Sequence, residues 1–230
     1  MNSLDSDVRI KALLAELHAA SAAQNAALAR FIGDDGFRSV AGSPSEIETG
    51  RAFWRDKLVA LEPEKARFCY MLIRAMGARS VVEVGTSFGV STLYLAAAVK
   101  DNGGGCVIAT ELEPQKAAMA RAHFARAGLS EFIDLREGDL RQTLAQIDAP
   151  IDFVLMDVWT PMARAAIALL APHLREGAVV VADNTETYCS DYADYFAFLA
   201  DPANGFSTEV LPFDGGLSLS IKTGALIPAT

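Results

Sequence analysis

The sequence predicts an α/β protein with a doubly wound, mostly parallel seven-stranded sheet. Between residues 79 and 184, five Val- and Ile-rich runs lack in-out alternation, which is typical of parallel strands covered on both faces. A helical pattern separates each run from the next, so right-handed crossovers are expected. Two further runs flank Asp214, Gly215 and Gly216, a strong signal for a C-terminal antiparallel hairpin.

Residues 1–62 are predicted to form an N-terminal helical extension, and residues 63–230 the domain that contains the sheet. Residues 4–32 are rich in Ala and Leu at helical spacing, and a segment of Gly, Asp, Ser and Pro interrupts the pattern at 33–46. Ser45 is a suitable cap for a second helix over 46–61. Pro63 suits the first turn of a third helix, which runs from Glu64 to about Met76.

The later elements follow in order along the chain. Strands are predicted over 79–85, 106–112, 131–137, 151–157 and 177–184, and helices over 90–100, 114–128 and 162–174, with a short helix before the fourth strand. The hairpin joins strands over 206–213 and 217–223.

The overall charge narrows the classes of partner. The chain has 20 Lys and Arg against 29 Asp and Glu, a net charge of -9, which disfavours nucleic acid or a membrane surface. Cys69, Cys106 and Cys189 are scattered and are predicted to be reduced thiols. The acidic start does not resemble a signal peptide, and no apolar stretch is long enough to cross a membrane. We therefore expect a soluble, cytoplasmic protein.

Acidic residues follow the predicted strands. In open α/β sheets, ligands bind outside the carboxyl ends of the strands. Any single acid there is usually a helix cap or a turn residue. Here four of the five strands end on an acid and the remaining one leads into a Gly-Asp pair, so the collection predicts a ligand site: Glu83, Glu111, Gly138-Asp139, Asp157 and Asp183-Asn184.

The turn after the first strand suggests the kind of ligand. Gly85 and Gly89 allow close approach of the backbone, and the helix that follows favours an electron-rich group at its N-terminus. Glu83 disfavours a pyrophosphate in this loop and suits a ligand with a positive charge. Glu111 can accept hydrogen bonds from a ribose diol. S-adenosylmethionine, a nucleoside with a cationic and phosphate-free tail, satisfies both observations.

Several motifs together resemble the cation-dependent O-methyltransferases, the group of catechol and caffeoyl-CoA O-methyltransferases: VVEVGTSFGVSTL, ATELEP, EGDL, FVLMDVW and GAVVVADN. The resemblance extends from Glu64 to the C-terminus and implies a Rossmann-like methyltransferase fold. It places Glu111 at the ribose of the cofactor and Trp159 beside the adenine or the substrate entrance; a core aromatic is the alternative for Trp159. Around the methionine end it places Glu83, Gly85, Ser87, Gly89 and Ser91, and beside the adenine Gly138 and Asp139.

The same resemblance implies a divalent cation, and a catalytic centre, at Asp157, Asp183 and Asn184. Three hard oxygen ligands suit Mg²⁺, with Mn²⁺ or Ca²⁺ as alternatives. Such an ion would stabilise the alkoxide form of a substrate hydroxyl. In the alternative interpretation, Asp183 and Asn184 only cap the next helix and Asp157 contacts only the cofactor.

Thr160 departs from the family pattern. The family usually has a lysine there as the general base, whereas we interpret Thr160 as an N-cap that precedes a first-turn proline. Three hypotheses follow: a metal-bound hydroxyl loses its proton to water, another group acts as base, or the chain binds cofactor without efficient catechol chemistry. The candidates for another base are Tyr188, Asp191 and His173. Of these, His173 is expected at the opposite end of the sheet from the site. His18 and His123 are assigned no catalytic role.

The leading hypothesis is an S-adenosylmethionine-dependent, Mg²⁺-assisted O-methyltransferase acting on a small hydroxylated molecule, with an aromatic or catechol-like molecule as the expected type. The alternatives are methylation of a modified RNA base, and a cofactor-binding protein with a decayed active site. The N-terminal helices are expected to cover the cofactor or substrate and to contribute to a homodimer.

Overall fold

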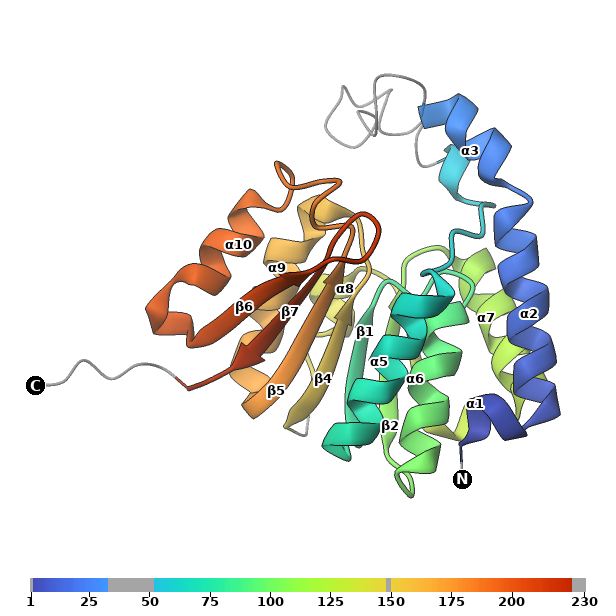
Figure 1. Cartoon of the computed structure of the whole chain (residues 1–230), viewed down its shortest axis with the longest axis horizontal. Helices are drawn as coiled ribbons and strands as arrows, with labels where there is room; N and C mark the ends of the chain where they lie inside the picture. Colours follow the sequence, from blue (N-terminus) through green and yellow to red (C-terminus); the bar gives the residue numbers. More distant parts are fainter. Residues whose placement is uncertain (1, 33–51, 148–149, 225–230) are drawn as a thin grey trace, which may run out of the picture.

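The computed structural model describes residues 2–32, 52–147 and 150–224, which contain one seven-stranded sheet (Figure 1). The strand order is β3-β2-β1-β4-β5-β7-β6. The first five strands pair in parallel, and β7 is antiparallel to both of its neighbours. This confirms the predicted fold class, with these strands: β1 Ser80–Val84, β2 Cys106–Glu111, β3 Ile133–Glu137, β4 Ile151–Met156, β5 Leu174–Asp183, β6 Phe206–Leu211 and β7 Leu217–Lys222.

The helices begin and end where the sequence signals lie. Pro63 and Pro114 occupy the first turns of α5 and α7, and Gly77 and Gly128 follow these helices in the left-handed conformation that closes a helix. The helices with assigned bounds are α1 Ser3–Ser6, α2 Val8–Ala22, α3 Asn25–Ile32, α5 Pro63–Met76, α6 Val90–Asp101, α7 Pro114–Ala127, α8 Leu140–Thr143, α9 Thr160–Leu170 and α10 Ala193–Ala200.

Alternate residues of the central strands face two separate apolar layers. Val81 on β1 packs in the layer formed with α2, α5, α6 and α7, whereas Val82 packs in the layer formed with α8, α9 and α10. On β4, Phe153 and Val154 divide in the same way. A register slip of one residue would exchange the two faces, so these layers fix which residues emerge at the strand ends.

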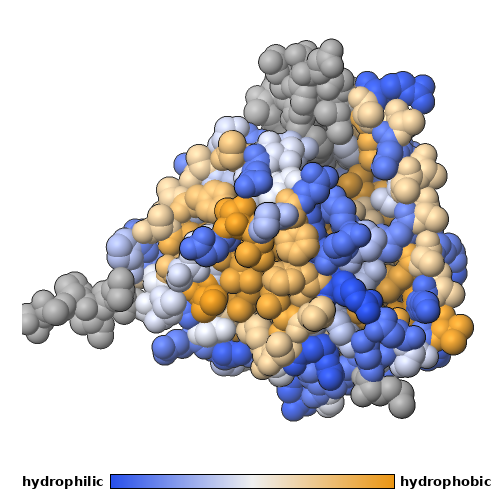
Figure 2. All heavy atoms as spheres, viewed as in Figure 1, coloured by the Kyte–Doolittle hydropathy of each residue, from blue (hydrophilic) through white to orange (hydrophobic). Residues whose placement is uncertain are grey.

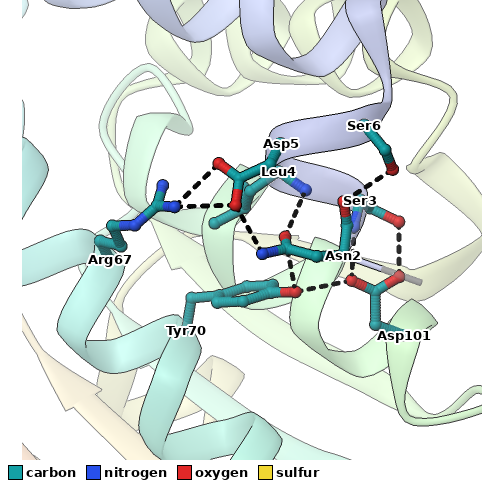
Figure 3. A network of polar contacts seen from close by, with 8 residues as sticks. All are labelled: Asn2, Ser3, Leu4, Asp5, Ser6, Arg67, Tyr70 and Asp101. Atoms are coloured by element: carbon teal, nitrogen blue, oxygen red, sulfur yellow. Dashed lines mark hydrogen bonds and ion pairs between the residues drawn. The ribbon is translucent and has the colours of Figure 1, made fainter.

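The N-terminal extension is anchored by a polar network (Figure 3). The backbone N–H of Ser3 donates to Asp101 on α6 at 2.7 Å, and the Tyr70 hydroxyl of α5 donates to the same carboxylate at 2.7 Å. Arg67 of α5 forms an ion pair with Asp5 of α1 at 2.8 Å. The network therefore ties α1 to the two helices that cover β1.

The second predicted helix, over 46–61, is wrong in its C-terminal half. Residues 52–54 are helical, but no helix covers 57–62, and the proposed cap Ser45 lies outside the described residues. The Leu58 N–H donates to the Gln24 side chain at 3.2 Å, and the Ala60 N–H donates to the Ser21 hydroxyl at 3.2 Å. These bonds to α2 and the residues that follow it replace the helical hydrogen bonds.

One face of the sheet carries an apolar surface. Figure 2 shows hydrophobic side chains gathered over β4, β5 and β7 on the face turned to the viewer. Ile221 on β7, which is paired with Val179, is 40% exposed.

Within the described ranges, no helix is long and apolar enough to cross a membrane. The division at residue 62, the cytoplasmic location and the homodimer stay predictions.

Candidate functional site at the carboxyl edge of the sheet

The strand register brings the predicted acids into one row. Val84, Thr110, Met156 and Ala182 are paired across four adjacent strands. The residues that follow them along the chain therefore leave the sheet at the same edge: Gly85, Glu111, Asp157 and Asp183. Because all four strands run in parallel, their carboxyl ends form one continuous rim, where ligands bind in folds of this type.

Glu83 lies two residues before Gly85, inside this rim, and is fully buried. Its Oε2 accepts hydrogen bonds from the hydroxyls of Thr86 at 3.1 Å and Thr92 at 2.5 Å. Its Oε1 has no hydrogen-bond partner among the described residues. Burial raises the pKa of Glu83 to about 7, although the Ser91, Thr92 and Thr86 hydroxyls favour the charged form. A buried carboxylate with one open oxygen suits a cationic group.

The loop after β1 has no space for a side chain at either of its two glycines. Gly85 has φ +95°, and a Cβ there would lie 2.0 Å from the carbonyl oxygen of Asp157. Gly89 has φ +82°, and a Cβ there would lie 2.4 Å from the ring of Phe124. Ser87 also has a positive φ of 50°. These requirements place the loop backbone tightly between the end of β4 and α7.

The Glu111 side chain is fixed against this loop. Its Oε2 accepts the Ser87 N–H at 2.6 Å, and its Oε1 accepts the Glu113 N–H at 2.8 Å. Each carboxylate oxygen can accept two hydrogen bonds, so acceptor capacity remains for a diol. Burial raises the pKa of Glu111, partly offset by the backbone N–H of Glu113 and the charge of Lys116.

The residues predicted near the adenine flank Glu111. The Gly138 N–H donates to the Glu111 carbonyl at 2.8 Å. Asp139 caps α8 through the Arg141 N–H at 2.9 Å, and hydrogen bonds from Arg141 lower the pKa of Asp139 to about 2.

Trp159 is 38% exposed and meets Trp54 edge-on, with ring centroids 5.9 Å apart. Trp159 is thus more exposed than a core aromatic.

Asp157 and Asp183 form the acidic centre of the rim. Burial raises the pKa of Asp157 well above its usual value, and the charges of Asp183 and Glu83 raise it further. Burial also raises the pKa of Asp183, although Lys65 opposes that shift. Asn184 has φ 57° and donates its amide N–H to Asp183 at 2.9 Å. The next helix, α10, is preceded by Tyr192. Asp183 and Asn184 therefore do not cap α10, contrary to the alternative interpretation.

The donor set at this centre fits a divalent cation by its chemistry. Among the described residues, no three His, Cys, Asp or Glu side chains cluster as metal ligands. The predicted set instead combines two aspartates with an amide, and oxygen donors of this kind are those that Mg²⁺ prefers. The charges of Asp183 and Glu83 add to burial in raising the pKa of Asp157, so acidic side chains lie close together at this centre. The roles of these three residues stay predictions.

Lys65 is a residue of this centre that the sequence analysis missed. Its ammonium lies 2.6 Å from Asp183 Oδ1 and 3.0 Å from Glu62 Oε2, and its side chain is 1% exposed. Lys65, Cys69 and Ile73 follow the buried stripe of α5 at spacings of four. A lysine in phase with apolar residues was the available signal, because lysine is almost never buried unless it is paired.

Thr160 is the first residue of α9, so its interpretation as the N-cap was wrong by one position: the N-cap is Trp159. The Thr160 hydroxyl donates to Asp191 Oδ2 at 3.4 Å. Asp191 therefore reaches the position where the family pattern has a lysine.

No catalytic role is assigned to the histidines, and this stays a prediction. His173 precedes β5 at the opposite edge of the sheet. His18 Nε2 lies 3.0 Å from the Tyr94 hydroxyl, and His123 Nδ1 lies 2.9 Å from the Phe88 carbonyl. Tyr188 is partly buried, and burial raises the pKa of its hydroxyl. Of the three candidates for a general base, Asp191 and Tyr188 lie on the segment that follows β5.

An open cavity of about 480 Å³ lies elsewhere, along α9 and α10. Its lining contains none of the predicted site residues: Arg164, Asp194, Ala197, Phe198, Asp201 and Asn204. The carboxyl rim, and not this cavity, carries the chemistry described above.

Comparison with known proteins shows that the chain is similar to methyltransferases, in agreement with the ligand site inferred above. Residues 82–185 match a family model described as a methyltransferase domain. A catechol O-methyltransferase of Niastella koreensis is 29% identical over 130 residues, 55% of this chain and 58% of that protein. A catechol O-methyltransferase of Mycobacterium tuberculosis is 32% identical over 127 residues, 55% of this chain and 57% of that protein. The chain thus spans somewhat more than half the length of these relatives.

Solved structures extend the likeness to the whole fold. Cofactor-bound Rv0187 from MTB has a TM-score of 0.65 at 25% identity and covers 80% of this chain and 91% of that chain. An O-methyltransferase from Bacillus cereus, solved in complex with SAH, has a TM-score of 0.65 at 21% identity and covers 90% of this chain and 100% of that chain. The second similarity concerns the fold alone.

Proposed function

We propose that this chain transfers a methyl group from S-adenosylmethionine to a hydroxyl of a small, catechol-like molecule, because residues 82–185 match a methyltransferase domain model and the chain is similar to catechol O-methyltransferases over more than half of its length. The observation that carries the proposal is the row of Gly85, Glu111, Asp157 and Asp183 at one rim of the sheet. Pairs of acids at such a rim provide sites for a ribose, a cationic tail and a hard cation.

Glu83 and Glu111 divide the binding of the cofactor between them in this proposal. Glu83 offers its open Oε1 to the cationic amino acid end. Glu111, held by Ser87 and Glu113, accepts hydrogen bonds from the ribose diol. In the loop between them, Gly85 and Gly89 carry no side chain, which allows the tight backbone path beside the proposed cofactor site.

Asp157, Asp183 and the amide oxygen of Asn184 would hold a divalent cation. When bound, such an ion supplies Lewis acidity that favours the ionised form of a substrate hydroxyl. The chain itself contributes position: strand ends on a rigid sheet keep the acceptor oxygen aligned with the methyl group, which converts an encounter into an oriented reaction.

Asp191 is the general base that we favour in place of the lysine. Its carboxylate meets Thr160 at the helix start that follows Asp157 and Trp159. A carboxylate suffices for a hydroxyl whose acidity a neighbouring cation has raised, because the base need only match the lowered pKa of that hydroxyl. Asp191 would take the proton as the oxygen forms its bond to the methyl carbon and the carbon–sulfur bond breaks.

Isothermal titration with S-adenosylmethionine, followed by methyl transfer to a panel of catechols with Mg²⁺ or with EDTA, tests the proposal. We expect cofactor binding, transfer to vicinal diols and loss of transfer in EDTA. Binding without transfer to any member of the panel would instead favour the decayed-site alternative. Methylation of RNA, with a salt-dependent shift of an RNA probe, would favour the second alternative.

A further inference from the structure

Lys65 is placed on α5 where an apolar residue would ordinarily lie. Pro63 fixes the start of the helix, and the buried stripe from Lys65 through Cys69 to Ile73 faces the sheet. The lysine side chain is 1% exposed and therefore has given up nearly all of its hydration. The free-energy cost of such burial is comparable to the attraction that the ion pair returns, so the pair contributes little to stability by itself.

The partner of Lys65 is one of the two acids at the centre of the site. Its ammonium donates to Asp183 Oδ1 at 2.6 Å, while the amide N–H of Asn184 donates to Asp183 Oδ2 at 2.9 Å. The Asp183 carboxylate is thus held at both oxygens. Lys65 approaches from α5, and Asn184 approaches from the loop after β5. The plane of the carboxylate follows from these two contacts.

The two contacts differ in what a ligand would displace. If the Asn184 side-chain amide turns over, it presents its oxygen in place of its N–H, and Asp183 Oδ2 is then free for a ligand. The bond from Lys65 to Oδ1 need not change. Lys65 therefore contacts Asp183 Oδ1, the oxygen that would keep its protein partner when a ligand binds Oδ2.

The charges around Lys65 leave room for a further cation. Glu62 and Asp183 form ion pairs with its ammonium, and its charge also acts on Asp157 from a greater distance. Glu62 is 48% exposed and is partly solvated by water, whereas Asp183 is 5% exposed. The ammonium thus gives its buried contact to Asp183 and leaves Asp157 without a direct ion pair to it among the described residues.

We propose that Lys65 is a positioning residue that orients Asp183 for a divalent cation and, through it, the substrate hydroxyl. This inference rests on the proposed function, because it assigns Lys65 to the same site. Partners that hold a metal-ligating carboxylate in place typically contribute about 10- to 100-fold to metal affinity. The sequence motifs do not include this residue, and the fold brings it to the site from outside them.

Binding of Mn²⁺ alone, followed by electron paramagnetic resonance, tests the role without turnover. K65M keeps the length and the apolar stem but removes the charge, whereas K65R keeps a charge and donors. We expect Mn²⁺ to bind K65M at least about 10-fold more weakly than wild type, and K65R to recover most of that loss. K11M, at an exposed lysine of α2, should bind as wild type.

Binding of S-adenosylhomocysteine separates this role from a general effect on the fold. Its affinity should stay within about 3-fold of wild type in K65M, since Lys65 contacts Asp183 and Glu62 but not the glycine loop. If K65M does not fold, K65Q and K65R form the second pair. K65Q, which keeps a donor without a charge, should then bind Mn²⁺ more weakly than K65R.

Two results would overturn the inference in different ways. Equal or tighter Mn²⁺ binding by K65M would show that Lys65 does not position Asp183 for the ion, and would leave the proposed function intact. A wild-type protein that binds S-adenosylhomocysteine but no Mn²⁺ would overturn both the cation assignment and the role of Lys65. Methyl transfer without a metal would still be tested by the catechol panel.

Discussion

Gly85 and the carbonyl oxygen of Asp157 approach so closely that a Cβ on Gly85 would lie 2.0 Å from that oxygen. This contact joins the loop after β1 to the end of β4. A hydrogen bond joins the same two segments: the Asp157 N–H donates to the Val84 carbonyl at 3.0 Å. The loop after β1 and the acidic centre are therefore in direct backbone contact.

G85A should destabilise the protein more than a substitution of a glycine in open space. Its left-handed conformation costs about 1–2 kcal/mol for any L-residue, and the collision with backbone adds about 1–3 kcal/mol. G77A is the matched control, since Gly77 has φ +62° with nothing within 4 Å of the added Cβ. Chemical denaturation measures both, and equal losses of stability would contradict the close contact.

E83Q should change how stability depends on pH. Burial raises the pKa of Glu83 from 4.5 to about 7, so the folded state holds a proton that the unfolded state has lost. This group therefore lowers the free energy of unfolding as pH rises from about 4.5 through about 7, by at most about 3 kcal/mol. Compared with E83Q, the wild-type protein should lose more stability between pH 5 and pH 8.

The Glu83 prediction is checked by thermal unfolding across that range, with E209Q at an exposed position of β6 as the control. Parallel curves for wild type and E83Q would refute it. The same variant should bind S-adenosylmethionine about 10- to 100-fold more weakly, because a hydrogen bond to a charged group contributes about 1.5–3 kcal/mol.

E111A should remove discrimination between ribose and deoxyribose. The wild-type carboxylate is held by the N–H groups of Ser87 and Glu113 and can accept from a diol. We expect S-adenosylhomocysteine to bind wild type about 10-fold more tightly than its 2′-deoxy analogue, and E111A to bind the two alike. Titration calorimetry with both ligands measures the difference. Discrimination that survives in E111A would place the ribose elsewhere.

D191N should lower kcat at neutral pH by at least about 100-fold if Asp191 is the base. T160V, which removes only the hydroxyl that donates to Asp191, should keep most of the activity and is the matched control. The affinity for S-adenosylmethionine should change in neither variant. A large gain in turnover on catechols in T160K, with no effect of D191N, would instead mean that the site lacks an effective base.

Much of the site could be predicted because strand ends in a parallel sheet are set by pattern. The Val- and Ile-rich runs fixed β1, β2 and β4, and with them Glu83, Glu111 and Asp157. Lys65 could not be found in this way, since its role depends on how α5 packs against β5, a contact between residues 118 positions apart. The coil at 57–62 was missed for the same reason: Gln24 and Ser21 supply its hydrogen bonds from α2 and the turn that follows it.

A crystal structure with S-adenosylhomocysteine and Mn²⁺ tests the central claim most directly. The account predicts the ribose at Glu111, the amino acid end near Glu83 and an anomalous Mn²⁺ peak between Asp157 and Asp183. Cofactor bound away from this rim would contradict the account. So would a structure in which the cofactor and Mn²⁺ contact none of the acids of the site: Glu83, Glu111, Asp157 and Asp183.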